Sequence, residues 1–202
     1  MIIKTVKHTI HIIVAIFHFS FIFANENQFY FNHIHTEMGL PSNSIKCFFQ
    51  DNKGFIWLGT NNGLSKYDAY SFKTWKYSPF KASGLSNNIV NCIEQDYNGN
   101  LLVGTNNGLS IFNFQEDSFR YLLALPPNSA KKKIIVTSLA ETEEGFIFIG
   151  TSQGIFLYDP HNHSGEQLIK LKDPRFQIGY VRDIAEIPGQ NKIWIASVAG
   201  IH

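Results

Sequence analysis

The sequence predicts an all-β fold made of repeated four-stranded units, and three observations carry this prediction. The heptapeptide GTNNGLS occurs twice, at 59–65 and again at 104–110. Weaker copies begin at Gly150 and Ala196, which makes the spacings 45, 46 and 46 residues. Each copy follows an apolar triplet rich in β-branched and aromatic residues, a composition typical of strands. A constant period of this length indicates a repeat protein with one small sheet per unit.

The apolar triplets are the second strands of these predicted sheets, at 56–58, 101–103, 147–149 and 193–195. Their continuous hydrophobicity predicts burial on both faces, as in a sheet that lies between neighbouring sheets. A first strand precedes each triplet and is joined to it, in the first unit, by a tight turn at 51–54. Third and fourth strands follow at 64–67 and 72–77. Four antiparallel strands in about 45 residues form a propeller blade.

We therefore expect residues 25–202 to form part of a β-propeller, an incomplete ring with three blades and the start of a fourth. The repeats are expected at about 39–83, 84–129, 130–175 and 176–202. A propeller closes only as a ring, of roughly four to eight blades. Because the sequence stops at His202, directly after the fourth triplet, we expect the N-terminal piece of a longer protein or the product of a truncated gene.

The GT-x-x-G segments are predicted to be hairpin turns between second and third strands, in which Asn62-Gly63 and Asn107-Gly108 supply positive φ. A phosphate-binding loop is the alternative for such a segment. That loop would need a following helix and a Lys-Ser/Thr pair, whereas Leu64 begins another strand. The predicted turn residues are Gly59, Thr60, Asn62, Gly63, Gly104, Thr105, Asn107, Gly108, Gly150, Thr151 and Gly154.

The N-terminus predicts export from the cytoplasm. Residues 1–24 have the pattern of a signal peptide, because basic residues come before an apolar run at 10–23 that is short for a membrane span. Cleavage is expected after Ala24, and an uncleaved anchor is the alternative. The two cysteines, Cys47 and Cys92, occupy matching places in the first two units and are predicted to be small buried residues rather than a disulfide.

The sequence offers no carrier for catalysis, metal binding or nucleic-acid binding. Charged residues make up 16% of the chain and the net charge is +1, so that no basic surface for nucleic acid is expected. The histidine pairs His33/His35 and His161/His163 have no repeated acidic or cysteine partner, and no metal site is predicted from them. No nucleophile or cofactor motif occurs, which predicts a protein that is not an enzyme and binds no cofactor.

Aromatic side chains are the candidates for contact with a sugar, because sugar rings stack on tryptophan and tyrosine. Trp57 and Trp194 lie inside apolar triplets and are predicted to be core residues. Trp75 and Tyr77, on the outer strand of the first blade, have no fixed counterpart in the other units. These two are the predicted candidates for ligand contacts at the rim.

The repeat motifs resemble those of the two-component regulator propeller family. They are GLPSNSI at 39–45, DNKGFIWLGTNNGLSKYD at 51–68 and DYNGNLLVGTNNGLSIF at 96–112, and the resemblance extends from about Phe29 to the last residue. It implies the N-terminal, periplasmic sensor region of a hybrid two-component histidine kinase. It also implies an oligosaccharide ligand, further blades, downstream sensor and kinase domains, an inner-membrane anchor and a homodimer in the full-length form.

Two other interpretations stay open at this point. An exported propeller lyase of the streptogramin-lyase type would share apolar triplets such as Ile56-Trp57-Leu58. A truncated gene product without function would also end abruptly. The ligand's identity is not encoded in any motif of the sequence.

Overall fold

The computed structural model describes residues 31–202, apart from 81–82, 124–132, 163–167, 172–178 and 191. The predicted signal peptide, 1–24, lies outside the described residues. Chain contacts divide the protein into 1–33 and 34–202, and the second unit holds all the strands that the structure describes. Among the described residues, no helix has the length and apolar character needed to cross a membrane.

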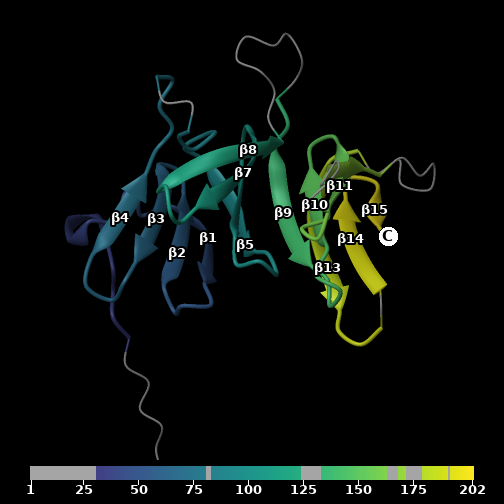
Figure 1. Ribbon diagram of the computed structural model, residues 1–202, viewed down its shortest axis with the longest axis horizontal. Helices are drawn as coiled ribbons and strands as arrows, with labels where there is room; N and C mark the ends of the chain where they lie inside the picture. Colours follow the sequence, from purple (N-terminus) through teal and green to yellow (C-terminus); the bar gives the residue numbers. More distant parts are fainter. Residues whose placement is uncertain (1–30, 81–82, 124–132, 163–167, 172–178, 191) are drawn as a thin grey trace, which may run out of the picture. The chain divides into compact units, whose positions relative to one another are not determined.

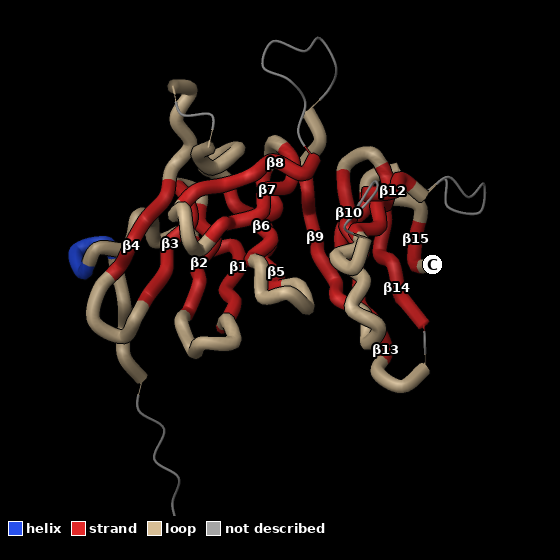
Figure 2. Tube along the Cα trace, viewed as in Figure 1, coloured by secondary structure: helices blue, strands red, loops and turns tan. Residues whose placement is uncertain are grey.

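The described strands form four antiparallel sheets in chain order, one for each repeat (Figure 1). Figure 2 shows that strands dominate the described part, together with one turn of 3-10 helix, η1 (Thr36–Met38). The prediction of an all-β fold with three four-stranded blades and the start of a fourth is confirmed.

The first blade contains β1 (Ile45–Gln50), β2 (Ile56–Thr60), β3 (Gly63–Tyr67) and β4 (Phe72–Trp75). The second contains β5 (Val90–Gln95), β6 (Leu101–Thr105), β7 (Gly108–Asn113) and β8 (Ser118–Leu123). The third contains β9 (Val136–Glu141), β10 (Ile147–Thr151), β11 (Gly154–Tyr158) and β12 (Leu168–Lys170), and the fourth β13 (Val181–Ile187), β14 (Lys192–Ser197) and β15 (Gly200–Ile201).

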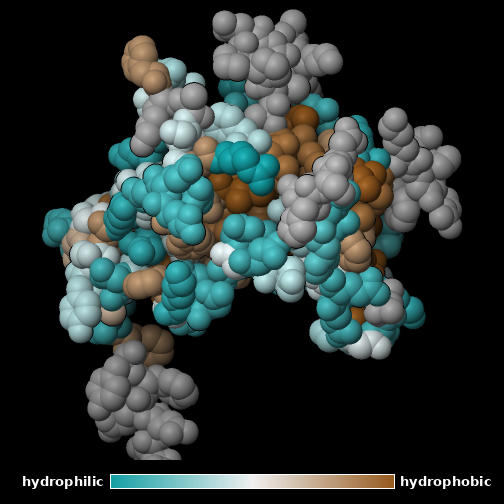
Figure 3. Space-filling view, in the orientation of Figure 1, coloured by the Kyte–Doolittle hydropathy of each residue, from teal (hydrophilic) through white to brown (hydrophobic). Residues whose placement is uncertain are grey.

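Apolar side chains from adjacent blades meet to form the core. Trp57 on β2 is fully buried, and its ring lies 5.4 Å from that of Phe112 on β7 of the next blade. Leu102 and Ile149 are fully buried in the cluster between the second and third blades. Figure 3 shows hydrophobic side chains gathered in this region, where β8, β9 and β10 approach one another. The second strand of the middle blade, β6, is therefore covered on both faces, as its composition predicts.

Trp194 does not follow the core prediction that holds for Trp57. Its side chain is 52% exposed. The two residues occupy equivalent places, but Trp57 faces the second blade, whereas β14 belongs to the last described sheet and no further sheet covers that face. The composition of the triplet was a correct guide to the strand, but burial also requires a neighbour on that side.

The first glycine of each GT-x-x-G segment lies in a strand rather than in the turn. Gly59 is in β2, Gly104 in β6 and Gly150 in β10. A Cβ on Gly59 would collide with Cys47 Sγ on the same sheet and lie 2.7 Å from Val90 Cγ1 on the next. Glycine is therefore required here because two blades approach closely, and no turn geometry is involved.

The turns themselves are organised by threonine hydroxyls. Thr60 Oγ1 donates a hydrogen bond to the Gly63 carbonyl, at 2.9 Å, and accepts one from the Asn62 N–H, also at 2.9 Å. Thr105 and Thr151 make the same pair of bonds in their turns. Gly63 has a φ of 115°, but the positive φ predicted for Asn62 and Asn107 is absent. The hydroxyl holds the two-residue loop, so that only the glycine needs left-handed freedom.

Candidate ligand-binding site

The start of each first strand is fixed to the hairpin turn of its own blade. The N–H groups of Asn106 and Ser152 donate to the carbonyls of Ile89 and Ile135, at 3.1 and 2.8 Å. Asn61 makes the corresponding bond to Ser44 at 3.3 Å. The beginnings of β1, β5, β9 and β13 and the hairpin turns therefore lie at one end of the blades, which we call the turn face.

The turns of the first two blades are also bonded to the blade that follows. The Gly63 N–H donates to the Asn88 carbonyl at 2.7 Å, and the Gly108 N–H donates to the Ile134 carbonyl at 2.8 Å. In addition, β5 contacts both β1 and β9, and β9 contacts β13. The first strands of all the described blades are therefore held side by side at the turn face.

A β-bulge leaves one residue unpaired near the start of every first strand. On β1, Ile45 pairs with Thr60 and Cys47 with Gly59, so that Lys46 has no partner in the ladder. The same shift occurs on β5, β9 and β13. The unpaired residues are Lys46, Asn91, Thr137 and Arg182. Bulges redirect side chains, and these four are polar although an isoleucine or valine precedes each of them.

The four bulge residues line one cavity at the turn face, of about 460 Å³, which we call the first-strand cavity. Its volume falls within the range of roughly 300 to 1,000 Å³ that is usual for small-molecule sites. The complete lining is Lys46, Asn91, Asn106, Ile135, Thr137, Tyr180 and Arg182. Every described blade contributes at least one side chain, so a ligand bound here would contact all of them.

The neutral bulge residues also connect blade to blade. Asn91 Nδ2 donates to Asn106 Oδ1 and to the Val136 carbonyl, both at 2.9 Å. Thr137 Oγ1 donates to the Val181 carbonyl at 2.9 Å. The two bonds to carbonyls reach from one first strand to the beginning of the next, and the bond to Asn106 stays within the second blade. Together they give this part of the cavity a fixed shape.

The two cationic bulge residues are placed differently. Lys46 and Arg182 are exposed, and no carboxylate occurs in the lining of the first-strand cavity. In the part of the chain that the structure describes, neither side chain forms an ion pair or hydrogen bond. Their charged groups are therefore available to a ligand.

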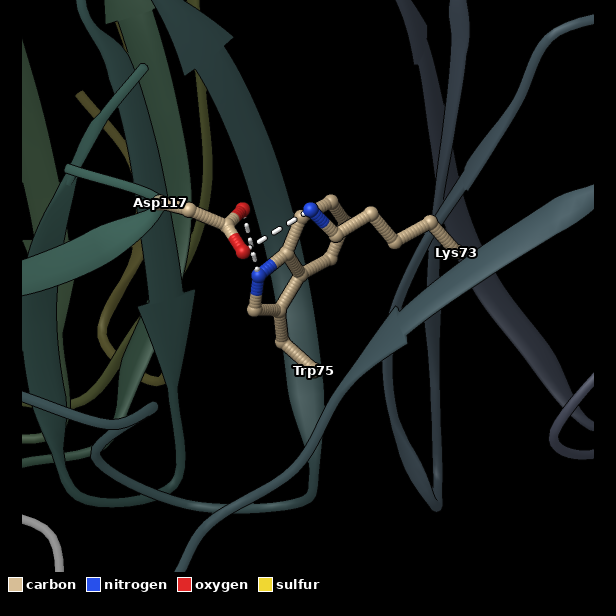
Figure 4. Close-up of polar contacts among 3 residues, drawn as sticks. All are labelled: Lys73, Trp75 and Asp117. Atoms are coloured by element: carbon tan, nitrogen blue, oxygen red, sulfur yellow. Dashed lines mark hydrogen bonds and ion pairs between the residues drawn. The ribbon is translucent and has the colours of Figure 1, made fainter. Parts of the chain in front are cut away.

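Trp75, one of the two rim candidates, lies between the first and second blades (Figure 4). Its ring stacks on that of Trp57 at 5.3 Å, and its Nε1 donates to Asp117 Oδ1 at 3.1 Å. Figure 4 shows Lys73 Nζ reaching the other carboxylate oxygen of Asp117, at 2.8 Å. Trp75 thus has both its ring and its N–H engaged within the protein.

Tyr77, the other rim candidate, lies just beyond the end of β4 rather than on it. Its side chain is 45% exposed, and its backbone N–H donates to Asn88 Oδ1 at 2.8 Å. Neither Tyr77 nor Trp75 lines the first-strand cavity. Contact between these two residues and a ligand stays a prediction.

A larger groove, of about 960 Å³, lies at the other end of the blades. Its lining comes from the turn after β1, the turn after β5 and the β7–β8 hairpin, including Asn98, Phe114 and Tyr121. Most of this lining belongs to the second blade. The first-strand cavity is the stronger candidate because residues from all the described blades converge on it.

The thiols are unsuited to nucleophilic chemistry. Cys47 and Cys92 are free and partly buried, which agrees with the prediction of two unbridged small residues. Burial raises the pKa of the Cys47 thiol to about 12, against opposing effects of the Gly59 backbone and Lys46, and burial also raises the pKa of Cys92. Both therefore stay protonated near neutral pH. Among the described residues, no three His, Cys, Asp or Glu side chains form a metal-binding group.

Comparison with known proteins identifies the repeat. The model of the family described as "Two component regulator propeller" matches residues 39–62 and 84–107. These two segments are two-component regulator propeller repeats. The matched segments run from the start of a blade through its first two strands to the hairpin turn, so that they contain Lys46 and Asn91 and the glycines at the blade contacts. No curated protein matches the chain.

Solved structures that resemble the chain share its propeller fold. The extracellular domain assigned to the hybrid two-component system BT4673 from B. thetaiotaomicron is 23% identical, with a TM-score of 0.66. The alignment covers 83% of this chain and 22% of that domain, so the chain spans about a fifth of the length of its structural relative. Virginiamycin B lyase from Staphylococcus aureus is 16% identical, with a TM-score of 0.54, over 81% of this chain and 56% of the lyase.

The lyase comparison can be set against the residues of the first-strand cavity. A variant of that lyase in which a histidine is replaced by alanine is described as catalytically inactive. The lining of the first-strand cavity contains no histidine, carboxylate or cysteine. The lining does contain the amine of Lys46 and the phenol of Tyr180, together with amide and hydroxyl groups that can bind a ligand.

Proposed function

We propose that these regulator propeller repeats form part of an extracytoplasmic sensor domain and that the first-strand cavity binds its ligand, a carbohydrate. One observation carries the proposal: polar side chains from every described blade converge on a single cavity, at positions that take no part in strand pairing. The lining combines hydrogen-bonding groups with the ring of Tyr180, the combination that sugar hydroxyls and sugar rings require.

The wider arrangement of the sensor belongs to the same proposal. The repeat family and the extracellular domain of BT4673 support a location outside the cytoplasm, in the periplasm. The chain would act within a longer, membrane-anchored protein, with further blades and with signalling domains that work as a homodimer. A ligand that contacts several blades at once would alter their relative positions, and the change would be passed to the following domains.

Ligand binding can be tested with the purified chain. Calorimetric titration against a panel of neutral and acidic oligosaccharides should find at least one that binds. Tyr180→Ala removes a cavity side chain that is 37% exposed and should weaken that binding about 3- to 10-fold. Tyr70→Ala is the matched control, because Tyr70 is 95% exposed and lies in the turn between β3 and β4, at the other end of the blade.

Two results would contradict this assignment of the site. One is the absence of binding by every oligosaccharide in the panel. The other is a bound oligosaccharide whose affinity falls as much with Tyr70→Ala as with Tyr180→Ala.

A further inference from the structure

The charges in the first-strand cavity are one-sided. Lys46 and Arg182 supply two positive charges to its lining, and no acidic side chain among the residues that the structure describes lies in that lining. The whole chain has a net charge of only +1, so this is a local concentration of charge rather than a property of a basic protein. Clefts lined by one sign of charge favour ligands of the opposite sign.

The two neutral bulge residues of the lining are already hydrogen-bonded within the protein. Asn91 Nδ2 donates both of its hydrogen bonds to protein acceptors, and the Thr137 hydroxyl donates to a carbonyl of the next blade. By contrast, Lys46 and Arg182 make no such bonds among the described residues. The charged donors that line the cavity for a ligand are therefore Lys46 and Arg182, beside the Tyr180 hydroxyl and the Asn106 amide.

The places of Lys46 and Arg182 in the fold favour ligand binding over a purely structural role. Lys46 occupies the bulge of the first blade. At the corresponding bulges of the second and third blades, Asn91 and Thr137 form hydrogen bonds to the blade that follows. A lysine and an arginine at bulges could extend into water at any surface site, but here both reach the same cavity from different blades. Two cations on separate rigid blades can hold one anionic group or two neighbouring ones.

We propose that the first-strand cavity selects a saccharide that bears a carboxylate or sulfate group, which Lys46 and Arg182 bind while Tyr180 contacts the sugar ring. This inference rests on the proposed function, since it names the ligand class of the same site. Guanidinium and ammonium groups form charge-assisted hydrogen bonds with both kinds of anion. Loss of one such bond lowers affinity by about 10- to 100-fold.

The experiment compares three probes on the purified chain: trigalacturonate, its carboxyl-reduced neutral counterpart, and a sulfated trisaccharide. We expect at least one anionic probe to bind and the neutral one to bind about tenfold or more weakly. Arg182→Gln and Lys46→Gln should each lower the affinity for the anionic probe, whereas Arg182→Lys should retain most of that affinity. Lys192→Gln is the control, because it removes one positive charge at the far end of β14, away from the cavity.

The outcomes separate this inference from the proposed function. Binding of the carboxylate or of the sulfate probe alone supports the inference and identifies the anion. Equal binding of the neutral probe, lowered by Tyr180→Ala but unchanged by Arg182→Gln, overturns the anionic preference and leaves the carbohydrate site standing. If no probe of either charge binds, nor any oligosaccharide of the wider panel, both proposals fall. Binding of inorganic sulfate as tightly as the sulfated trisaccharide would overturn the role of the sugar.

Discussion

Replacement of Gly104 by alanine tests the close contact between the second and third blades. Gly104 has no positive φ, so alanine is tolerated by its backbone and any effect arises from packing. The added Cβ would collide with Cys92 Sγ and lie 2.6 Å from Val136 Cγ1, where ordinary contacts are 3.4–4 Å. The valine methyl would have to retreat by about 1 Å.

The surroundings of Val136 allow little retreat. The side chain is fully buried in a cluster with Leu102 and Ile149, which are also fully buried. Overpacking of this kind costs about 1 to 3 kcal/mol, and two simultaneous collisions place Gly104→Ala in the upper half of that range. The corresponding fall in the thermal midpoint is roughly 4 to 10 °C for a domain of this size.

Urea unfolding followed by circular dichroism and tryptophan fluorescence measures the change. Ala196→Gly is the matched control: Ala196 holds the equivalent place in the fourth sheet, on the face that no further sheet covers, and we expect a change below about 1 kcal/mol. Val136→Ala should relieve the collision, so its cost should be smaller in the Gly104→Ala background than in the wild type. A Gly104→Ala cost under about 0.5 kcal/mol, or strictly additive effects of the two substitutions, would refute the argument.

Three further predictions concern the turns, a half-buried carboxyl group and the contact between the first two blades. Thr105→Val should lower the free energy of unfolding by about 1 to 3 kcal/mol, because the buried hydroxyl bonds Gly108, Asn107 and Ser86. Thr105→Ser should cost much less in the same urea titration, and equal losses would contradict the role given to the hydroxyl. Burial, reinforced by Glu141, raises the pKa of Glu94, so the folded state holds this proton to higher pH than the unfolded state and loses stability as pH rises through the raised pKa. Glu94→Gln should therefore raise the thermal midpoint at pH 7 more than at pH 4, and an equal shift at both pH values would disprove the electrostatic cause. Asp117→Ala should cost about 1 to 2 kcal/mol, since it removes the acceptor of Trp75 and Lys73 and places alanine at a φ of 51°. Asp117→Asn keeps one acceptor and tolerates this φ, so calorimetry should show a smaller loss.

The sequence was informative wherever structure follows from local composition. The triplet at 101–103 is apolar throughout, and it belongs to the fully buried β6. The same reasoning was less successful for the GT-x-x-G segment, because glycine is needed there for two reasons. Gly63 supplies a positive φ, whereas Gly59 makes room for Val90 of another blade, which no local rule reveals.

The first-strand cavity could not be predicted from the sequence, because the bulges depend on how two strands are paired. Lys46 and Arg182 are 136 residues apart, and each looks like an ordinary polar residue at the start of a strand. One signal was available: in the aligned repeats, the position after a constant isoleucine or valine is always polar but is never the same residue twice. Variation at one register position among otherwise similar units was the sign of a site.

At most positions of a sheet, a residue must both fit its strand partners and present a suitable side chain to its surroundings. The bulges free a residue from the first of these requirements. A residue inside the ladder must suit its partners on both neighbouring strands, so its replacement alters the stability of the blade. Lys46 and Arg182 need not fit a strand partner, because they are unpaired and the ladder continues on either side of them. Substitution at these positions can therefore change the charge and size of the cavity while the blades stay intact. A single propeller framework could in this way be adapted to chemically different ligands through a few residues.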